Sequence, residues 1–140
     1  MNLIYSNQRW NQAAAFFVRM NVFVIEQKIS IQDEFSQIDQ EDTRYFVIYD
    51  NEKPVATACF QELEGNAIQP DRVCVLKEYR KLGLGTQLLN AIEAHTGAKF
   101  SRLHAEISAI EFYEKLGYKI SGGYFKEDGI PVVRMIKQLR

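Results

Sequence analysis

The chain of 140 residues has little net charge and no long apolar run. Its formal net charge of −1 argues against a general electrostatic attraction to nucleic acid. No apolar stretch approaches the roughly 20 residues that a membrane-spanning helix needs. The opening MNLIYSNQRW also lacks the basic start and the apolar stretch of a signal peptide. We therefore expect a soluble, cytoplasmic protein with neither nucleic acid nor membrane as partner.

The chain has few cysteines and no arrangement of them that is typical of a metal site. Cys59 and Cys74 lie in separate apolar, strand-like stretches, without a Cys-x-x-Cys or Cys/His cluster. This predicts two reduced, buried thiols and no metal. Internal repeats and low-complexity linkers are also absent from the sequence. Because 140 residues with 46% apolar content can bury a core, we expect residues 1–140 to form one domain.

The hydrophobic pattern predicts both strands and helices. A helix capped by Ser6 or Asn7 should follow the first strand, with Trp10 and Phe17 on its apolar face. Residues 22–43 indicate a short helix or a loop. Further helices are expected from Leu84 to about Gly97 and over 108–117. The expected strands cover residues 3–5, 43–50, 55–63, 67–76, 100–107, 118–125 and 131–139.

The connections between these elements predict how the strands pair. Short turns favour an antiparallel meander over the strands at 43–50, 55–63 and 67–76. The helix after 67–76 makes the strand at 100–107 parallel to it, through a right-handed crossover. The predicted fold class is therefore α/β (α+β), with a mixed, mostly antiparallel sheet of about six to seven strands and helices on both faces.

The segment RKLGLGT, from Arg80 to Thr86, joins a predicted strand to a predicted helix. The first N–H groups of a helix have no intrahelical partner, and the helix dipole favours negative charge there. Gly83 would let a phosphate approach the backbone closely, and Arg80 and Lys81 add positive charge. The segment therefore predicts a pyrophosphate site. It is not a Walker loop, which needs Gly-Lys-Ser/Thr, and position 88 is Leu where a dinucleotide fingerprint needs a third glycine.

Two longer stretches carry a family resemblance. RVCVLKEYRKLGLGTQLL (72–89), followed one strand later by AEISAIEFYEKLGY (105–118), resembles the GNAT superfamily of N-acetyltransferases. The first is similar to the family's acetyl-coenzyme A loop with its preceding strand, and the second to the next motif of the family. VFVIEQ (22–27) and GIPVVRM (129–135) look like a small bacterial ElaA/YjcF-like branch. The resemblance implies the GNAT fold and an acetyl-CoA-dependent N-acetyltransferase.

The resemblance also implies where acetyl-CoA binds. The pantetheine arm would run beside the strand at Val73, Cys74 and Val75, using backbone groups, so these side chains are free to pack in the core. The side chain of Cys74 should point to the opposite face from those of the two valines. Lys77 would either meet the outer phosphate or be solvated. The pyrophosphate would lie on Arg80, Lys81, Leu82, Gly83, Leu84, Gly85 and Thr86.

Tyr113 takes the position of the family's general acid. A substrate amine attacks the thioester, coenzyme A leaves as a thiolate, and a phenol with a pKa of about 10 can protonate it. A purely structural alternative is that the ring of Tyr113 packs against the sheet. The backbone N–H near Val75 would polarise the thioester oxygen. No covalent enzyme intermediate is expected, and neither cysteine needs to take part.

An alkyl amine is protonated at neutral pH, so a base must first remove a proton. The candidates are Glu26 and Glu106, then Asp71 and His104. Glu26 lies in an apolar string, which predicts partial burial and a raised pKa, although an N-cap or an ion pair with an arginine would explain it equally. Glu106 stands where many family members have Asn, which puts the usual coenzyme contact in doubt. His104 is more readily explained as a structural residue.

The acceptor is not identified by the sequence. An acidic stretch falls where GNAT proteins build the wall of the acceptor site, and it would suit a cationic amine on a small molecule or peptide. A solvated charged face is the alternative. The fold could also bind acyl-CoA without turnover, as a sensor or a subunit, and dimers are common in the family. The acidic residues are Asp33, Glu34, Asp39, Glu41 and Asp42.

Overall fold

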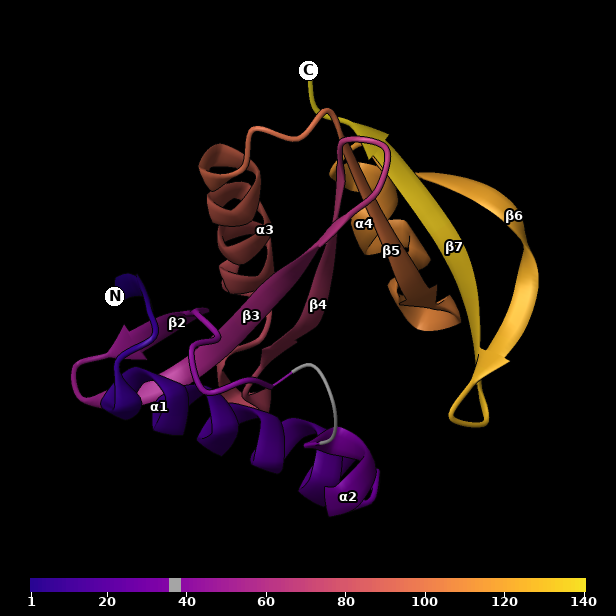
Figure 1. Cartoon of the computed structure of the whole chain (residues 1–140). Coiled ribbons are helices and arrows are strands. Elements are labelled where there is room, and N and C mark those ends of the chain that lie inside the picture. The colour runs from indigo at the N-terminus through magenta and orange to yellow at the C-terminus, as the bar shows by residue number, and fades with distance from the viewer. Residues whose placement is uncertain (36–38) are drawn as a thin grey trace. The chain divides into compact units, whose positions relative to one another are not determined.

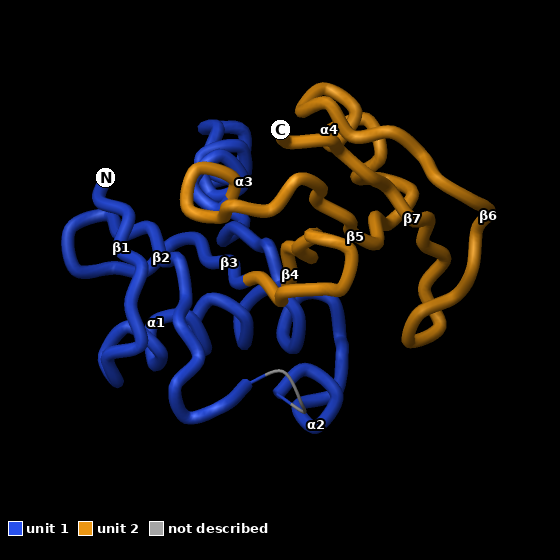
Figure 2. Tube along the Cα trace, turned by 45° about the horizontal axis from the view of Figure 1, so that its top comes forward, with its two compact units in different colours: residues 1–59, 72–92 blue, residues 60–71, 93–140 orange. Residues whose placement is uncertain are grey.

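The computed structural model describes residues 1–35 and 39–140. These residues gather into two compact units, which are described separately (Figure 2). One contains residues 1–59 and 72–92, and the other contains residues 60–71 and 93–140. That the chain folds as one domain stays a prediction. Over the described ranges, no helix is long and apolar enough to cross a membrane.

Seven strands of the described chain form one hydrogen-bonded sheet in the order β1-β2-β3-β4-β5-β7-β6 (Figure 1). The β4/β5 pair is parallel, whereas β1/β2, β2/β3, β5/β7 and β6/β7 are antiparallel. The predicted mixed, mostly antiparallel sheet is therefore confirmed. The strands are β1 (Asn2–Ser6), β2 (Tyr45–Asp50), β3 (Lys53–Leu63), β4 (Ala67–Val75), β5 (Phe100–Glu106), β6 (Lys119–Glu127) and β7 (Ile130–Gln138).

The first unit begins with β1 and a long helical stretch: α1 (Arg9–Arg19) continues into a π-helical segment, η1 (Met20–Glu26), and the short α2 (Ile31–Glu34) follows. The predicted apolar face of α1 is wrong, because Trp10 is 53% and Phe17 is 45% exposed. Hydrogen bonds from a buried polar side chain determine instead which face of α1 is buried. The buried Asn11 amide donates to the backbone oxygens of Ser6 and Tyr45, at 3.1 and 2.9 Å. The buried face of α1 consists of Asn11, Ala15, Val18 and Arg19.

The helix α3 (Leu84–His95) begins inside the segment Arg80–Thr86, directly after Gly83. A 3₁₀ turn, η2 (Lys77–Tyr79), separates that segment from β4. The predicted apolar stripe is confirmed, since its four residues are buried: Leu84, Leu88, Leu89 and Ile92.

The second unit is built on β5, which pairs with β4 at Ala67–Phe100 and Ile68–Ser101 and with β7 along its whole length. β7 lies between β5 and β6, an order that the sequence did not predict. The 3₁₀ turn η3 (Ile107–Ala109) leads from β5 into α4 (Ile110–Lys115), which lies against β5 and β7 in Figure 1.

The side chains of β5 alternate between the two faces of the sheet. Ser101, Leu103 and Ala105 are buried. The Ser101 hydroxyl lies 2.6 Å from that of Tyr118, just after α4, so this face is the one that α4 covers. The alternate residues are half-buried and point to the opposite face: Arg102, His104 and Glu106.

Candidate active site

The glycine-containing segment has the backbone geometry of a helix start that is open to an anion. Gly83 has a φ of +79°, and the Gln87 N–H donates to its carbonyl oxygen at 3.0 Å, so Gly83 is the last residue before α3. A Cβ at Gly83 would meet nothing within 4 Å. The N–H groups at the start of α3 have no acceptor within the helix and carry the positive end of its dipole. The segment fits a pyrophosphate by this geometry.

Arg80, at the start of this segment, is bound by protein groups. Its Nη1 and Nη2 donate to Glu26 Oε2 and Oε1 at 2.7 and 2.6 Å, and its Nε donates to the Val75 carbonyl oxygen at 3.0 Å. The predicted raised pKa of Glu26 is wrong, because the hydrogen bond from Arg80 lowers it. The ion pair with an arginine, one of the alternatives for Glu26, is present. Lys77, nearby in η2, is exposed.

The end of β4 alternates as predicted. Cys74 is buried, while Val73 and Val75 are half-buried, so the thiol points to the opposite face from the two valines. Burial raises the pKa of the Cys74 thiol far above its usual range. Cys59 is also buried, and neither cysteine forms a disulfide, which confirms the prediction of two reduced, buried thiols. Neither thiol is exposed as a nucleophile.

Tyr113, on α4, lies near two carboxylates of the same unit. Burial, and then the negative charges of Glu106 and Asp71, raise the pKa of Tyr113 to about 12. Glu106 ends β5 and Asp71 lies toward the end of β4, where its Oδ2 accepts a hydrogen bond from Gln61 Nε2 at 2.7 Å. The structure thus brings together three of the predicted groups: a protonated phenol and two candidate bases.

The ring of Tyr113 also packs against aromatic neighbours, and its role as general acid stays a prediction. It makes edge contacts with Tyr118, at 5.7 Å between ring centroids, and with Phe112, at 5.1 Å. Tyr118 is bonded to Ser101, so Tyr113 belongs to the helix-covered face of β5. Glu106 points to the other face. The negative charge of Glu106 nevertheless acts on the phenol, since it contributes to the raised pKa of Tyr113.

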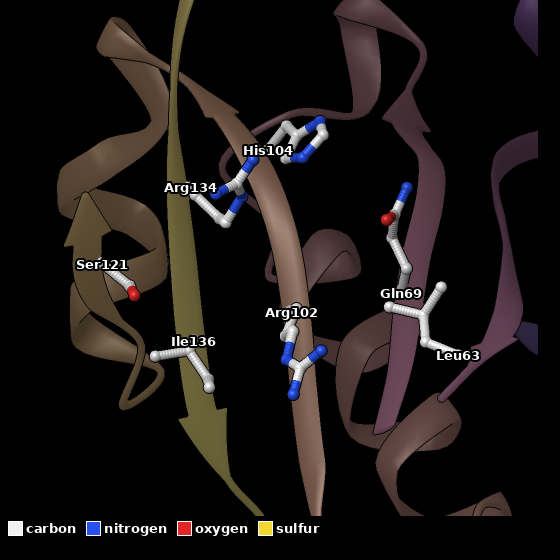
Figure 3. A pocket seen from close by; sticks show the side chains of 7 residues that line it. All are labelled: Leu63, Gln69, Arg102, His104, Ser121, Arg134 and Ile136. Carbon is white, nitrogen blue, oxygen red and sulfur yellow. The ribbon is translucent and has the colours of Figure 1, made fainter. Parts of the chain in front are cut away.

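His104 has a structural partner, in line with the structural role that the sequence favoured for it. Its Nδ1 lies 2.6 Å from Glu127 Oε2, and its ring contacts that of Phe125 at 5.1 Å between centroids. The ring also lines a cavity of about 460 Å³ on the open face of β5, which Figure 3 shows. The residues lining this cavity are Leu63, Gln69, Arg102, His104, Ser121, Arg134 and Ile136.

Two of the acidic residues expected to form an acceptor wall belong instead to an ion-pair network, in which Glu34 is buried and Asp39 is half-buried. The Arg19 guanidinium, with no exposed side-chain area, binds Glu34 Oε2 at 2.9 Å and Asp39 Oδ1 at 2.7 Å. Arg72 Nε lies 3.3 Å from the same Glu34 oxygen, and the Tyr45 hydroxyl donates to Asp39. Neither Glu34 nor Asp39 is free to face an acceptor, so the expected wall is wrong for these two residues.

The sequence reasoning missed the two arginines of the cavity, Arg102 and Arg134. The available signal was the period of two on β5, which places Arg102, His104 and Glu106 on one face. The position of Arg134 beside His104 could not be predicted from the sequence. It depends on the register in which β7 pairs with β5, where Arg134 is paired with His104. Among the described residues, no group of three or more His, Cys, Asp or Glu is placed to hold a metal ion.

The chain belongs to the GNAT family of acetyltransferases. The profile described as "Acetyltransferase (GNAT) domain" matches residues 41–120, more than half of the chain. A second comparison supports this membership: the uncharacterized N-acetyltransferase YjcF of Bacillus subtilis (strain 168) is 37% identical over 127 residues, which cover 88% of this chain and 89% of YjcF.

Solved structures show the same fold. A Lactobacillus plantarum protein provisionally described as an N-acetyltransferase is 38% identical to this chain. The two superpose with a TM-score of 0.95, over 99% of this chain and 98% of the Lactobacillus protein. An aminoglycoside 6′-N-acetyltransferase solved in complex with coenzyme A is 18% identical, with a TM-score of 0.77 over 100% of this chain and 98% of its own. The second likeness concerns the fold alone.

Proposed function

We propose that this protein transfers an acetyl group from acetyl-CoA to a primary amine by direct attack. The observation that carries the proposal is the arrangement at the end of β5, where a protonated Tyr113 lies near the carboxylates of Glu106 and Asp71. Family membership and the coenzyme A complex of a protein of the same fold support the donor. When bound, acetyl-CoA would supply the thioester carbonyl and the leaving thiolate.

The residues at the start of α3 would hold the pyrophosphate. The open backbone at Gly83 allows close approach, and the unpartnered N–H groups of the first helical turn supply donors. Arg80 would add a charge-assisted bond after exchanging one of its two bonds to Glu26. The backbone at Val73 and Val75 is the proposed contact of the pantetheine arm.

Tyr113 would protonate the leaving thiolate. With a pKa of about 12 the phenol stays protonated at neutral pH, so it can donate whenever the sulfur becomes negative. The proton is replaced from solvent. A raised pKa also makes the phenol a weaker acid, so it would act only as the negative charge develops on the sulfur.

Glu106 is the proposed base. Its carboxylate lies at the end of β5 and its charge acts on the Tyr113 phenol, so it could deprotonate an amine close to the group that would protonate the thiolate. Asp71 is the weaker candidate, because one of its oxygens already accepts a hydrogen bond from Gln61. Glu26 is not proposed as the base, since its carboxylate is bound to Arg80 and its pKa is lowered.

The test is release of free thiol from acetyl-CoA with a panel of amines, for the native protein and Tyr113→Phe. Turnover with at least one amine class, reduced about 100-fold in the variant at unchanged acetyl-CoA affinity, is expected. Phe112→Leu serves as the control for loss of aromatic packing beside Tyr113. Binding of acetyl-CoA in a calorimeter without turnover on any amine would contradict the proposal and favour an acyl-CoA-binding sensor.

A further inference from the structure

The cavity on the open face of the second unit is lined by positive charge. Arg102 comes from β5 and Arg134 from β7, and Figure 3 shows both guanidinium groups on the same side of the sheet as the His104 ring. None of the lining residues carries a carboxylate. Gln69 and Ser121 add polar groups on either side. With a volume of about 460 Å³, the cavity is large enough for a small organic molecule.

The two arginines of the cavity differ from the buried Arg19, whose guanidinium is saturated by carboxylates. Within residues 1–35 and 39–140, no hydrogen bond or ion pair engages the side chain of Arg102 or Arg134. Arg134 makes only a cation–π contact, with its guanidinium carbon 5.6 Å from the Phe125 ring centroid. The Glu127 carboxylate is bonded to His104, which also lines the cavity. Positive charge therefore faces the cavity without a protein counter-ion.

We propose that this cavity binds an anionic group, a carboxylate or a phosphate, on the amine that is acetylated. Guanidinium groups bind both anions through paired N–H donors, and Arg is the usual residue for such recognition. Arg102 and Arg134 would hold the anion, with the Gln69 amide as a further donor. The acceptor is then an amine that also carries a negative charge. This inference rests on the proposed function, whose acceptor class it names.

The positions on β5 set the length of this acceptor. The Cα atoms of residues two apart on a strand are separated by about 7 Å. The Cα atom of Glu106 is therefore about 7 Å from that of His104 and about 13 Å from that of Arg102. Arg134 pairs in register with His104, at the same level of the sheet. If the amine meets Glu106, its anionic group should be separated from it by roughly 7 to 13 Å, which is the length of an extended amino acid of six or more carbons.

The kinetic test compares ω-amino carboxylates from glycine to 8-aminooctanoate, each with the alkylamine of equal length, by thiol release. Aminoalkyl phosphonates of matching length distinguish a carboxylate from a phosphate as the preferred anion. We expect kcat/KM to rise with length and to exceed that of the neutral amine about tenfold or more at six carbons. Equal use of charged and neutral amines, or a preference for glycine, would overturn the inference while leaving acetyl transfer intact.

Substitutions test whether the two arginines cause the preference for acceptors that carry an anionic group. Arg102→Gln and Arg134→Gln should each lower kcat/KM for the charged acceptors about 10- to 100-fold and leave neutral amines within about twofold, with partial rescue by Lys. Arg9→Gln, at an exposed arginine of the other unit, is the matched control and should change neither. Equal losses for charged and neutral acceptors would indicate a structural role and contradict the inference.

A binding measurement keeps the inference testable without turnover. Glutarate and hexanoate are titrated calorimetrically into the protein with saturating coenzyme A, which occupies the pyrophosphate site. We expect binding that is lost in the Arg102→Gln, Arg134→Gln double variant and kept in Arg9→Gln. If no amine is acetylated, this result still supports an anion site although the proposed function has failed. No binding, or binding unchanged in the double variant, would then overturn the inference.

Discussion

Glu26 and Arg80 form a bidentate ion pair, with N–O distances of 2.6 and 2.7 Å. It links the end of η1 to the segment before α3. The partners are 54 residues apart in the chain. Arg80 is the charge that the sequence assigned to the pyrophosphate, so a carboxylate of the protein already occupies the guanidinium that the phosphate would use. Glu26 and an incoming phosphate should compete for Arg80.

We therefore predict that Glu26→Gln binds coenzyme A more tightly. An ion pair of this exposure is worth little, so the gain should be about two- to fivefold in Kd, and it should disappear when Arg80→Gln is added. Calorimetry at low salt measures it. Glu78→Gln, which removes a nearby charge not paired with Arg80, is the control. Weaker binding by Glu26→Gln would show instead that Glu26 holds Arg80 in its binding position.

Arg19 is predicted to be essential for stability. Its guanidinium is fully buried and bonded to the side chains of Glu34 and Asp39. Arg19→Met would remove the main ionic partner of the buried Glu34 and the half-buried Asp39, which costs about 3–5 kcal/mol in the free energy of unfolding. Urea unfolding measures this loss. Arg9→Met should stay within about 0.5 kcal/mol, because its pair with Glu41 is exposed, and an equal loss in both variants would contradict the assignment.

Glu106→Gln is predicted to lower kcat/KM for amines about 100-fold or more, by removing the base while keeping the size of the side chain. Asp71→Asn should cost less, because Asp71 is already bonded to Gln61. Steady-state thiol release against pH checks both. The loss in Glu106→Gln should shrink at high pH, where the amine is deprotonated in solution. Glu111→Gln, an exposed residue of α4, is the control, and a larger loss in Asp71→Asn would reverse the assignment.

The pKa of Tyr113, raised to about 12, predicts the alkaline behaviour of the protein. The phenol should stay protonated at pH 10, where an ordinary tyrosine is half ionised, so kcat should not fall there. Because the folded-state pKa is above the unfolded one, the stabilisation from this group is complete below pH 10 and is lost as the pH rises through 12. Absorbance titration of the native protein against Tyr113→Phe measures the ionisation. A difference titrating near pH 10 would refute the prediction.

Much of the fold is local in origin and could be predicted. The stripe of Leu84, Leu88, Leu89 and Ile92 defines α3 because helical periodicity depends only on neighbouring residues. The parallel pairing of β4 with β5 follows from the helix that connects them. The position of β7 between β5 and β6 was not predictable in this way, because strand order depends on pairing between distant segments.

The candidate site likewise has residues that the sequence could predict and residues whose environment depends on the fold. Gly83 and Tyr113 were found from motifs, since a helix start and a family pattern are readable along the chain. For Glu26 the sequence left a raised pKa and an ion pair with an arginine equally open, because the pKa of a carboxylate depends on what folds against it, here Arg80. The face of α1 was misjudged for a related reason: hydrogen bonds to distant backbone bury Asn11 and leave Trp10 exposed.

The sequence by itself determined the order of the elements, the helix start at Gly83 and the family, because each depends on residues that are close in the chain. Only the tertiary structure decided which charges are paired. It paired Glu34 and Asp39 with Arg19, joined Glu26 to Arg80, and left Arg102 and Arg134 facing a cavity. The energy of a charge depends on its partners and its solvent, and folding sets both.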